Sequence, residues 1–261
     1  MLFLCNMNRA VEYLKYVLHA RNEHGLHSPF LFELYNEVFK SPKQFYCFDE
    51  LEAKRAALKK DHRIIKVSDF GAGSNYGGGS ERAISKIAKQ SLKSKKYAQL
   101  LFRLAHHLKP KRILELGTSL GLSTCYLALS NSKTEVVSIE ACPNIHREAK
   151  EIFKHFKIEN VKAINATFQD ALPELKGRFD IIFIDGHHDG PACLAYLEAL
   201  KKHLSQEAFV VVDDIRWSQD MFDAWMEMKQ DPFFQVSLDV FELGILVLRP
   251  QQSRSHHILR Y

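Results

Sequence analysis

The pattern of apolar and polar positions changes near residue 95. Before that point apolar residues recur at helical spacing, which predicts helices over 8–21, 28–39, 49–60 and 80–90. After it, helical segments alternate with short β-branched runs, which is the pattern of a mostly parallel sheet with helices on both faces. We therefore expect a helical N-terminal extension over 1–94 and an α/β domain over 95–261.

The second part of the chain contains seven predicted strands. Only Val240 to Leu243 separate the last two strands, so these two must form an antiparallel hairpin, because a parallel crossover needs a dozen or more residues. The expected fold class is thus α/β, a doubly wound seven-stranded sheet whose last strand is reversed. We place strands near 112–116, 135–140, 161–165, 180–185, 208–213, 234–239 and 244–249, and helices near 96–108, 121–129, 144–156, 190–203 and 218–229.

Composition excludes several classes of protein. Hydrophobic residues are 46% of the 261 positions and charged residues 26%, which excludes a disordered chain or a coiled coil. The longest apolar runs are about six residues, whereas a membrane-spanning helix needs about 20. Five scattered cysteines without a CxxC pair predict reduced thiols, and the opening MLFLC lacks the basic segment of a signal peptide. We expect a cytoplasmic protein with no membrane span.

Positive charge is concentrated in one stretch. Between Lys54 and Arg112 there are sixteen basic and three acidic residues, although the whole chain carries a net charge of only +5. Such a stretch indicates either a surface for an anionic partner, such as a nucleic acid, or a helix face that contacts water. The helical spacing of Arg82, Lys86, Lys89 and Lys93 favours the second interpretation.

A glycine-containing turn follows the first strand of the α/β part. In ILELGTSLGLST, Gly117 and Gly121 flank the turn, and Ser123 lies in the first turn of the next helix. Glycine lets the backbone approach a ligand, and a helix N-terminus offers free amide donors to an anion. The spacing is G-x-x-x-G and not G-x-G-x-x-G, which disfavours a nicotinamide or flavin cofactor.

An acidic residue, Glu140, ends the second strand, twenty-three residues after Gly117. A carboxylate at the tip of the neighbouring strand can accept both hydroxyl hydrogens of a ribose. The alternative is a surface acid with no function. Together with the glycine turn, Glu140 indicates a ligand that contains a nucleoside.

The ordered segments ILELGTSLGLST, VVSIEACP, NATFQDALPEL, FIDGHH and VVDDI resemble those of class I S-adenosylmethionine-dependent methyltransferases, closest to the catechol O-methyltransferase-like group. The resemblance covers 96–250 and implies a Rossmann-like fold, methyl transfer to a small hydroxylated acceptor, and S-adenosylmethionine as cofactor. It also implies that Ser123 binds the methionine carboxylate, Glu140 the ribose, and Phe168 and Gln169 the adenine. The remaining residues that it implies to line the methionine and ribose are Glu115, Gly117, Ser119, Gly121 and Asp185.

Three acids follow the fourth and fifth predicted strands, which should be neighbours: Asp185, Asp213 and Asp214. Clustered carboxylates either bind a cation or hold a proton. In the resembled enzymes two Asp and an Asn bind Mg²⁺, and Asp214 stands at the Asn position, so the resemblance implies a divalent metal site with one extra charge. The alternative is that Asp214 caps the next helix and Asp185 contacts only the cofactor.

His187 and His188 follow Asp185 directly, and either could remove a proton from an acceptor hydroxyl. The lysine of the resembled family, which would fall at His188, is absent. A loop histidine with no function is the alternative. The glycine-rich stretch 69–80 is predicted to be either a lid over the site or a connector.

Two other functions compete with O-methylation of a small-molecule acceptor. One is N-methylation of a nucleic acid or another anionic substrate, which the basic stretch favours. The segment FIDGHH disfavours it, because amino-methyltransferases of this fold usually carry Asn or Asp, two prolines and an aromatic residue after the fourth strand. The other is a methyltransferase-like binding module without catalysis, which the intact glycine turn and Glu140 disfavour. A homodimer is one oligomeric state that the sequence leaves open.

Overall fold

The computed structural model describes residues 8–68 and 81–261, which form two compact units. The first unit comprises Met1–Lys40 and Gly177–Tyr261, and the second Ser41–Lys176. The predicted N-terminal extension therefore contributes to both units: its beginning packs with the C-terminal strands, and the rest packs with the segment that contains the glycine turn. The glycine-rich stretch 69–80 lies outside the described residues.

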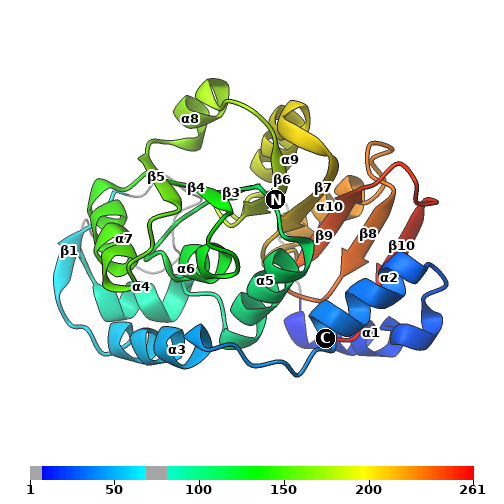
Figure 1. The fold of residues 1–261 in the computed structure, drawn as a ribbon, viewed down its shortest axis with the longest axis horizontal. Helices are drawn as coiled ribbons and strands as arrows, with labels where there is room; N and C mark the ends of the chain where they lie inside the picture. The colour runs from blue at the N-terminus through cyan, green and yellow to red at the C-terminus, as the bar shows by residue number, and fades with distance from the viewer. Residues whose placement is uncertain (1–7, 69–80) are drawn as a thin grey trace, which may run out of the picture. The chain divides into compact units, whose positions relative to one another are not determined.

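The second unit contains three parallel strands in the order β3-β4-β5 (Figure 1). They are β3 (Arg112–Leu116), β4 (Glu135–Glu140) and β5 (Val161–Asn165), at the positions that the sequence predicts. Their register pairs Leu116 with Ile139 and Glu140 with Asn165, so the carboxyl ends of the three strands meet at one edge. Residues that directly follow these strands are therefore brought together.

Helices of both parts of the sequence share the core of the second unit. Its largest buried side chains include Phe48, Ile84, Phe102, Tyr126 and Phe153, each from a different helix. Residues 41–68 and 81–94 thus contribute to the core of this unit. The helices are α3 (Cys47–Leu58), α4 (Ile84–Ser91), α5 (Lys95–Leu108), α6 (Leu122–Leu129), α7 (Pro143–His155) and α8 (Phe168–Glu174).

The first unit contains five strands in the order β10-β8-β9-β7-β6. Strands β6 (Phe179–Ile184) and β7 (Leu204–Val212) are parallel, as are β8 (Val236–Asp239) and β10 (Ser255–Ile258). Strand β9 (Gly244–Leu248) is antiparallel to both of its neighbours, β7 and β8. The predicted β8–β9 hairpin and the mostly parallel Rossmann-like α/β class are confirmed.

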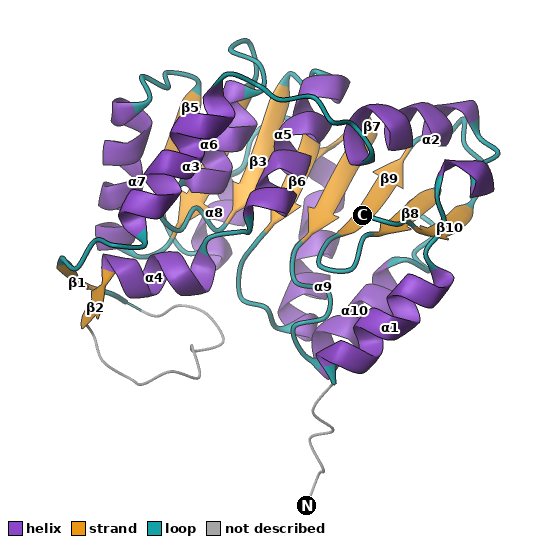
Figure 2. Cartoon of the chain, turned by 90° about the horizontal axis from the view of Figure 1, so that it is seen from below, coloured by secondary structure: helices purple, strands orange, loops and turns teal. Residues whose placement is uncertain are grey.

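The first unit also contains the helices α1 (Arg9–His19), α2 (Pro29–Leu34), α9 (Gly190–Leu200) and α10 (Gln219–Met228), the 3₁₀ segments η1 (Glu23–Gly25) and η3 (Lys201–His203), and the π-helical turn η2 (Tyr35–Phe39). Helices α9 and α10 are each capped by a side chain: Asp189 accepts from the Ala192 amide at 2.9 Å, and Ser218 accepts from the Met221 amide at 3.4 Å. Figure 2 shows α9 and α10 together in this unit.

Some elements differ from the sequence prediction. The sheet has eight strands rather than seven, because β10 pairs with β8 although its sequence, SHHI, contains only one aliphatic residue. The sequence prediction also omitted α8, which is seven residues long and contains Pro173, and the short antiparallel pair β1 (Ile64–Lys66) and β2 (Glu81–Ala83). No helix in 8–68 or 81–261 combines the length and the hydropathy that crossing a bilayer requires.

Candidate cofactor site and acidic edge

The glycine turn lies at the carboxyl end of β3, bonded to the neighbouring strand. The amides of Gly117 and Thr118 donate to the Ile139 carbonyl at 3.0 and 3.2 Å. Gly117 has φ 102°, and Ser119 has φ 48°, a value that is uncommon outside glycine. These bonds and angles turn the chain back from β3 so that Ser119 reaches the tip of β4.

Glu140 meets this turn directly. Its Oε2 accepts from the Ser119 amide at 2.9 Å, and its Oε1 accepts from the Cys142 amide at 2.9 Å. Burial raises the pKa of Glu140, while these two bonds favour the charged form. The structure thus brings together the glycine turn and the acid that the sequence selects, and it holds the carboxylate in one orientation.

Glu115 lies in the interior of the second unit, with 0% of its surface exposed. Its Oε2 accepts hydrogen bonds from the Ser138 hydroxyl at 2.6 Å and from the Thr124 hydroxyl. Burial raises the pKa of Glu115 to about 7. In this arrangement the carboxyl group is enclosed by side chains of β4 and α6.

Packing requires glycine at residue 121, the N-cap of α6. Gly121 has φ 77°, and a Cβ atom there would lie 2.7 Å from Cε1 of Phe153 on α7. Gly121 is buried, and its expected place in the lining of the cofactor stays a prediction. Ser123, in the first turn of α6, is partly exposed and remains a candidate for the methionine carboxylate.

The adenine candidates lie in the first turn of α8, just after the carboxyl end of β5. Thr167 caps this helix by accepting from the Asp170 amide at 3.2 Å. Phe168 is buried, and Gln169 is exposed. The turn at β3, the acid at β4 and the aromatic–amide pair at β5 therefore all lie at the carboxyl ends of adjacent parallel strands, where ligands of open α/β sheets bind.

In the first unit, Asp185 and Asp213 follow the neighbouring strands β6 and β7, whose register pairs Ile184 with Val212. Asp213 is only 2% exposed, and its Oδ1 accepts from the Asp214 amide at 2.8 Å. Ser218, and not Asp214, caps α10, so the interpretation of Asp214 as a helix cap is wrong. The side chains of Asp185 and Asp214 are partly exposed, at 13% and 19%.

The two histidines have different surroundings. The Nδ1 atom of His187 lies 3.1 Å from the hydroxyl of Tyr196 on α9, in hydrogen-bonding contact. His188 lies between the acids instead: its Nε2 is 3.9 Å from Oδ1 of Asp185 and 4.0 Å from Oδ2 of Asp214. Its ring centroid is 5.7 Å from that of Trp217, which is exposed. The structure therefore distinguishes the surroundings of the two histidines, which the sequence alone could not do.

The three acids were predicted to bind a divalent metal. Within the described parts of the chain, no three His, Cys, Asp or Glu side chains are arranged to hold a metal ion. Asp213 accepts from the next backbone amide through Oδ1, while Asp185 and Asp214 flank an imidazole nitrogen. The assignment of Asp185, Asp213 and Asp214 as metal ligands stays a prediction, and we derive no chemistry through a metal.

The sequence prediction missed two residues that contact predicted site residues. Ser91, at the end of α4, lies with its hydroxyl 2.7 Å from that of Ser119, so α4 contacts the glycine turn. Trp217 lies beside His188. No sequence pattern singles out Ser91, whereas Trp217 is an aromatic residue shortly after VVDDI, next to a predicted site.

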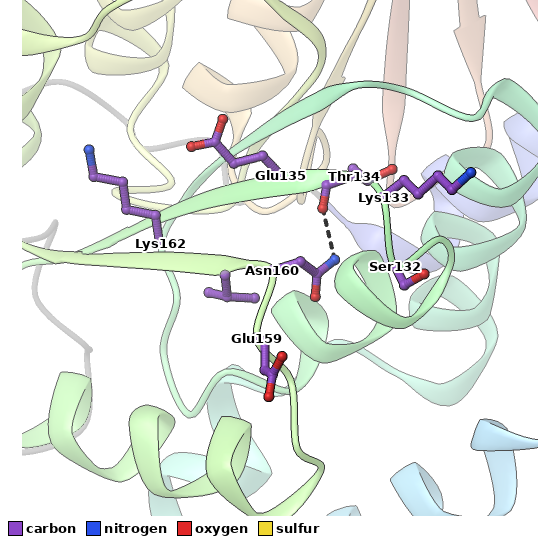
Figure 3. Close-up of a pocket in the computed structure, with 8 residues that line it drawn as sticks. Ser132, Lys133, Thr134, Glu135, Glu159, Asn160 and Lys162 are labelled. Atoms are coloured by element: carbon purple, nitrogen blue, oxygen red, sulfur yellow. Dashed lines mark hydrogen bonds between the residues drawn. The ribbon is translucent and has the colours of Figure 1, made fainter.

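A separate hollow of about 280 Å³ lies at the opposite, amino ends of β4 and β5 (Figure 3). It is lined by Ser132–Glu135 and Glu159–Lys162. The side-chain Nδ2 of Asn160 donates to the Thr134 carbonyl at 2.8 Å. The side chains in Figure 3 diverge instead of pointing to one centre. We therefore assign the candidate site to the carboxyl ends of the strands.

Comparison with known proteins agrees with the fold. Residues 114–215 match the model of a methyltransferase domain family, and the resemblance to the catechol O-methyltransferase-like group is confirmed by the curated relatives. The match covers β3 to the residues just after β7, including the glycine turn, Glu140 and the acids.

Among curated proteins, the chain is 31% identical over 115 residues to O-methyltransferase hkm8 of Aspergillus hancockii, covering 42% of this chain and 46% of that protein. It is 29% identical over 125 residues to catechol O-methyltransferase of Mycobacterium tuberculosis, covering 47% and 56%. The chain thus spans about half the length of the curated relatives that it matches.

Among solved structures, the Podospora anserina methyltransferase PaMTH1 bound to S-adenosylhomocysteine (SAH) has a TM-score of 0.56 to this chain. The two are 20% identical, and the match covers 79% of this chain and 97% of the other. At this identity the likeness shows the fold.

Proposed function

We propose that this protein is an S-adenosylmethionine-dependent O-methyltransferase that acts on a small hydroxylated acceptor. The observation that carries the proposal is the contact between the glycine turn and Glu140, in which the Ser119 amide donates to the carboxylate at 2.9 Å. The O-methyltransferase relatives support the choice of oxygen as the methylated atom.

In this proposal the second unit binds the nucleoside. Glu140 accepts the two ribose hydroxyl hydrogens, Gln169 and Phe168 bind the adenine, and Ser123 with the free amides of α6 binds the methionine carboxylate. Because two backbone amides fix the Glu140 carboxylate, little side-chain entropy is lost when the ribose binds. S-adenosylmethionine supplies the activated methyl group.

The first unit provides the base in this proposal. His188 accepts the proton of the acceptor hydroxyl, which makes the oxygen a better nucleophile. Asp185 and Asp214 lie within about 4 Å of its Nε2 and stabilise the imidazolium that forms. His187 is a positioning residue at most, because it contacts Tyr196.

The test is calorimetric titration with S-adenosylmethionine and with S-adenosylhomocysteine, followed by detection of S-adenosylhomocysteine release with catechols and simple phenols. We expect saturable binding of both nucleosides. Replacing Glu140 by glutamine removes a charged hydrogen-bond acceptor. Because hydrogen bonds to charged groups contribute about 1.5 to 3 kcal/mol, we expect the affinity for both nucleosides to fall about 10- to 100-fold. Glu135→Gln, at the other end of the same strand, is the matched control and should bind normally.

Absence of heat with either nucleoside, from a folded protein, would refute the proposal. Binding without turnover on any phenol, together with a salt-dependent gel shift with RNA, would favour the nucleic-acid alternative. That alternative rests on α4, whose Lys86 and Lys89 are exposed while Ile84 and Ile87 are buried.

A further inference from the structure

Helix α1 carries an apolar surface that the proposed reaction does not use. Eleven large hydrophobic side chains are exposed in the described parts of the chain, and five of them lie on α1: Val11, Tyr13, Leu14, Val17 and Leu18. Single exposed apolar residues are normal on a protein surface, whereas a contiguous group marks an interaction site. Figure 2 shows α1 at the outside of its unit.

The opposite face of α1 fixes the helix to its own unit. Tyr16 is buried, its hydroxyl donates to the Leu259 carbonyl at 2.6 Å, and it accepts from the Tyr261 amide at 2.9 Å. Its ring centroid lies 5.3 Å from that of Phe241. Val11, Leu14 and Leu18 follow one another at intervals of three and four residues, which is the spacing of a helix-pairing seam. The seam therefore faces away from the unit.

We propose that this seam, formed by Val11, Leu14, Val17 and Leu18, joins two copies of the chain into a homodimer, with the two α1 helices packed antiparallel about a two-fold axis at Leu14. A two-fold interface must be self-complementary. Around Leu14, the axis places Val11 opposite Val17. It also places Leu18, the most exposed at 81%, opposite the small Ala10.

The size of the surface fits a weak dimer. The four seam side chains and the neighbouring Tyr13 expose on the order of 500 Å² per copy, or about 1,000 Å² for two copies, which is the lower limit for a specific interface. An antiparallel arrangement also sets the two helix dipoles in the favourable direction.

The charges flanking the seam favour a second copy over a lipid surface. Lys15 is paired with Glu12 at 2.7 Å, and Arg9 is paired with Glu242 at 3.0 Å. Both of these cations are therefore already neutralised within the chain, whereas a helix that binds anionic lipids presents unpaired cations beside its apolar face.

The inference can be tested by sedimentation velocity on the full chain between about 1 and 200 µM. We expect a concentration-dependent monomer–dimer equilibrium. Leu14→Glu places two carboxylates at the axis and should raise the dissociation constant at least tenfold. Ile64→Glu, at an equally exposed position in the other unit, is the matched control and should leave it unchanged. Circular dichroism and S-adenosylhomocysteine binding check that both variants are folded.

A second measurement does not depend on a disruptive substitution. In a chain carrying Cys5→Ser, Leu14→Cys should give a disulfide-linked dimer on mild oxidation, because the axis brings the two copies of residue 14 together. The described native cysteines are buried. A chain that stays monomeric at 200 µM, a dimer that persists in Leu14→Glu, or a monomer that floats with phosphatidylserine vesicles would each overturn the proposal.

Discussion

The buried carboxyl group of Glu115 should make the stability of the protein depend on pH. Glu115 is enclosed between the hydroxyls of Ser138 and Thr124, and its pKa is raised from 4.5 to about 7 by burial. In the unfolded chain the group loses its proton above its ordinary pKa, whereas the folded protein retains it up to about pH 7. Folding therefore takes up a proton in this window, and stability falls as the pH rises through it.

The magnitude follows from the difference between the two pKa values. A shift of about 2.5 units, at 1.36 kcal/mol per unit, corresponds to a loss on the order of 3 kcal/mol once the pH is well above 7. Part of this loss has already occurred at pH 5.5, so the change between pH 5.5 and 8.5 is about 2 kcal/mol. The Ser138 and Thr124 hydroxyls reduce the shift, because they donate to the charged form.

The assay is urea unfolding of the wild type and of Glu115→Gln at several pH values between 5.5 and 8.5. Glutamine has nearly the same shape and does not titrate, so the difference between the two proteins isolates Glu115 from the other titrating groups. We expect Glu115→Gln to gain about 2 kcal/mol relative to the wild type across this range. Glu174→Gln, at an exposed position on α8, is the control and should show a constant difference.

Parallel stability curves for wild type and Glu115→Gln would refute the reasoning. They would mean that the carboxyl group ionises as easily in the folded protein as in the unfolded chain. The same outcome would contradict the complete burial of the Glu115 carboxyl group.

Three further predictions concern single side chains. Gly121→Ala should destabilise the protein by about 2 to 4 kcal/mol in chemical unfolding, because alanine combines an unfavourable positive φ with a contact on Phe153. Arg216→Met should cost about 3 to 5 kcal/mol, because it leaves the buried Asp239 carboxylate without its bidentate partner, and adding Asp239→Asn should recover part of this loss. If His188 is the base, His188→Gln should lower kcat about 100-fold or more while S-adenosylmethionine affinity stays within about threefold, and His187→Gln should have a small effect on both.

The strands around the candidate site could be predicted from the sequence because each is a short apolar run flanked by polar residues. Runs such as FDIIFI on β6 are buried almost along their whole length, which is the signal of a strand covered on both sides. Glu140 could be selected for the same reason: a polar residue that ends a buried strand must lie at an edge of the sheet. The contact between Glu140 and the glycine turn follows from the order of β3 and β4.

Other elements could not be predicted because tertiary contacts determine them. The sequence of β10 has little strand propensity. The strand is held by its ladder with β8 and by two backbone bonds to Arg21, whose amide donates to the Ile258 carbonyl and whose carbonyl accepts from the Arg260 amide. Helix α8 is too short for a helical period to be visible, and it begins where Thr167 caps it. In both cases distant or local polar bonds outweigh the intrinsic propensity of the segment.

Side-chain direction was the other limit. The positions of Asp185, Asp213 and Asp214 along the chain do not show which groups their carboxylates contact. In the structure Asp214 has a φ of 48°, and its amide donates to the Asp213 carboxylate. Aspartate adopts this left-handed conformation only occasionally, so the sequence does not predict it at Asp214.

Positive φ angles at residues other than glycine occur in both candidate regions of the chain. Ser119, His187, His188 and Asp214 all have this conformation, and each follows a strand at its carboxyl end. Each such residue costs on the order of 1 kcal/mol or more, so a fold selected for stability alone would place glycine there. Glycine would retain the backbone bond of Ser119 to Glu140 but would remove the imidazole that lies between Asp185 and Asp214. In the proposed reaction, that imidazole is the group that accepts the proton, so His188→Gly should lose activity even though glycine suits the backbone there.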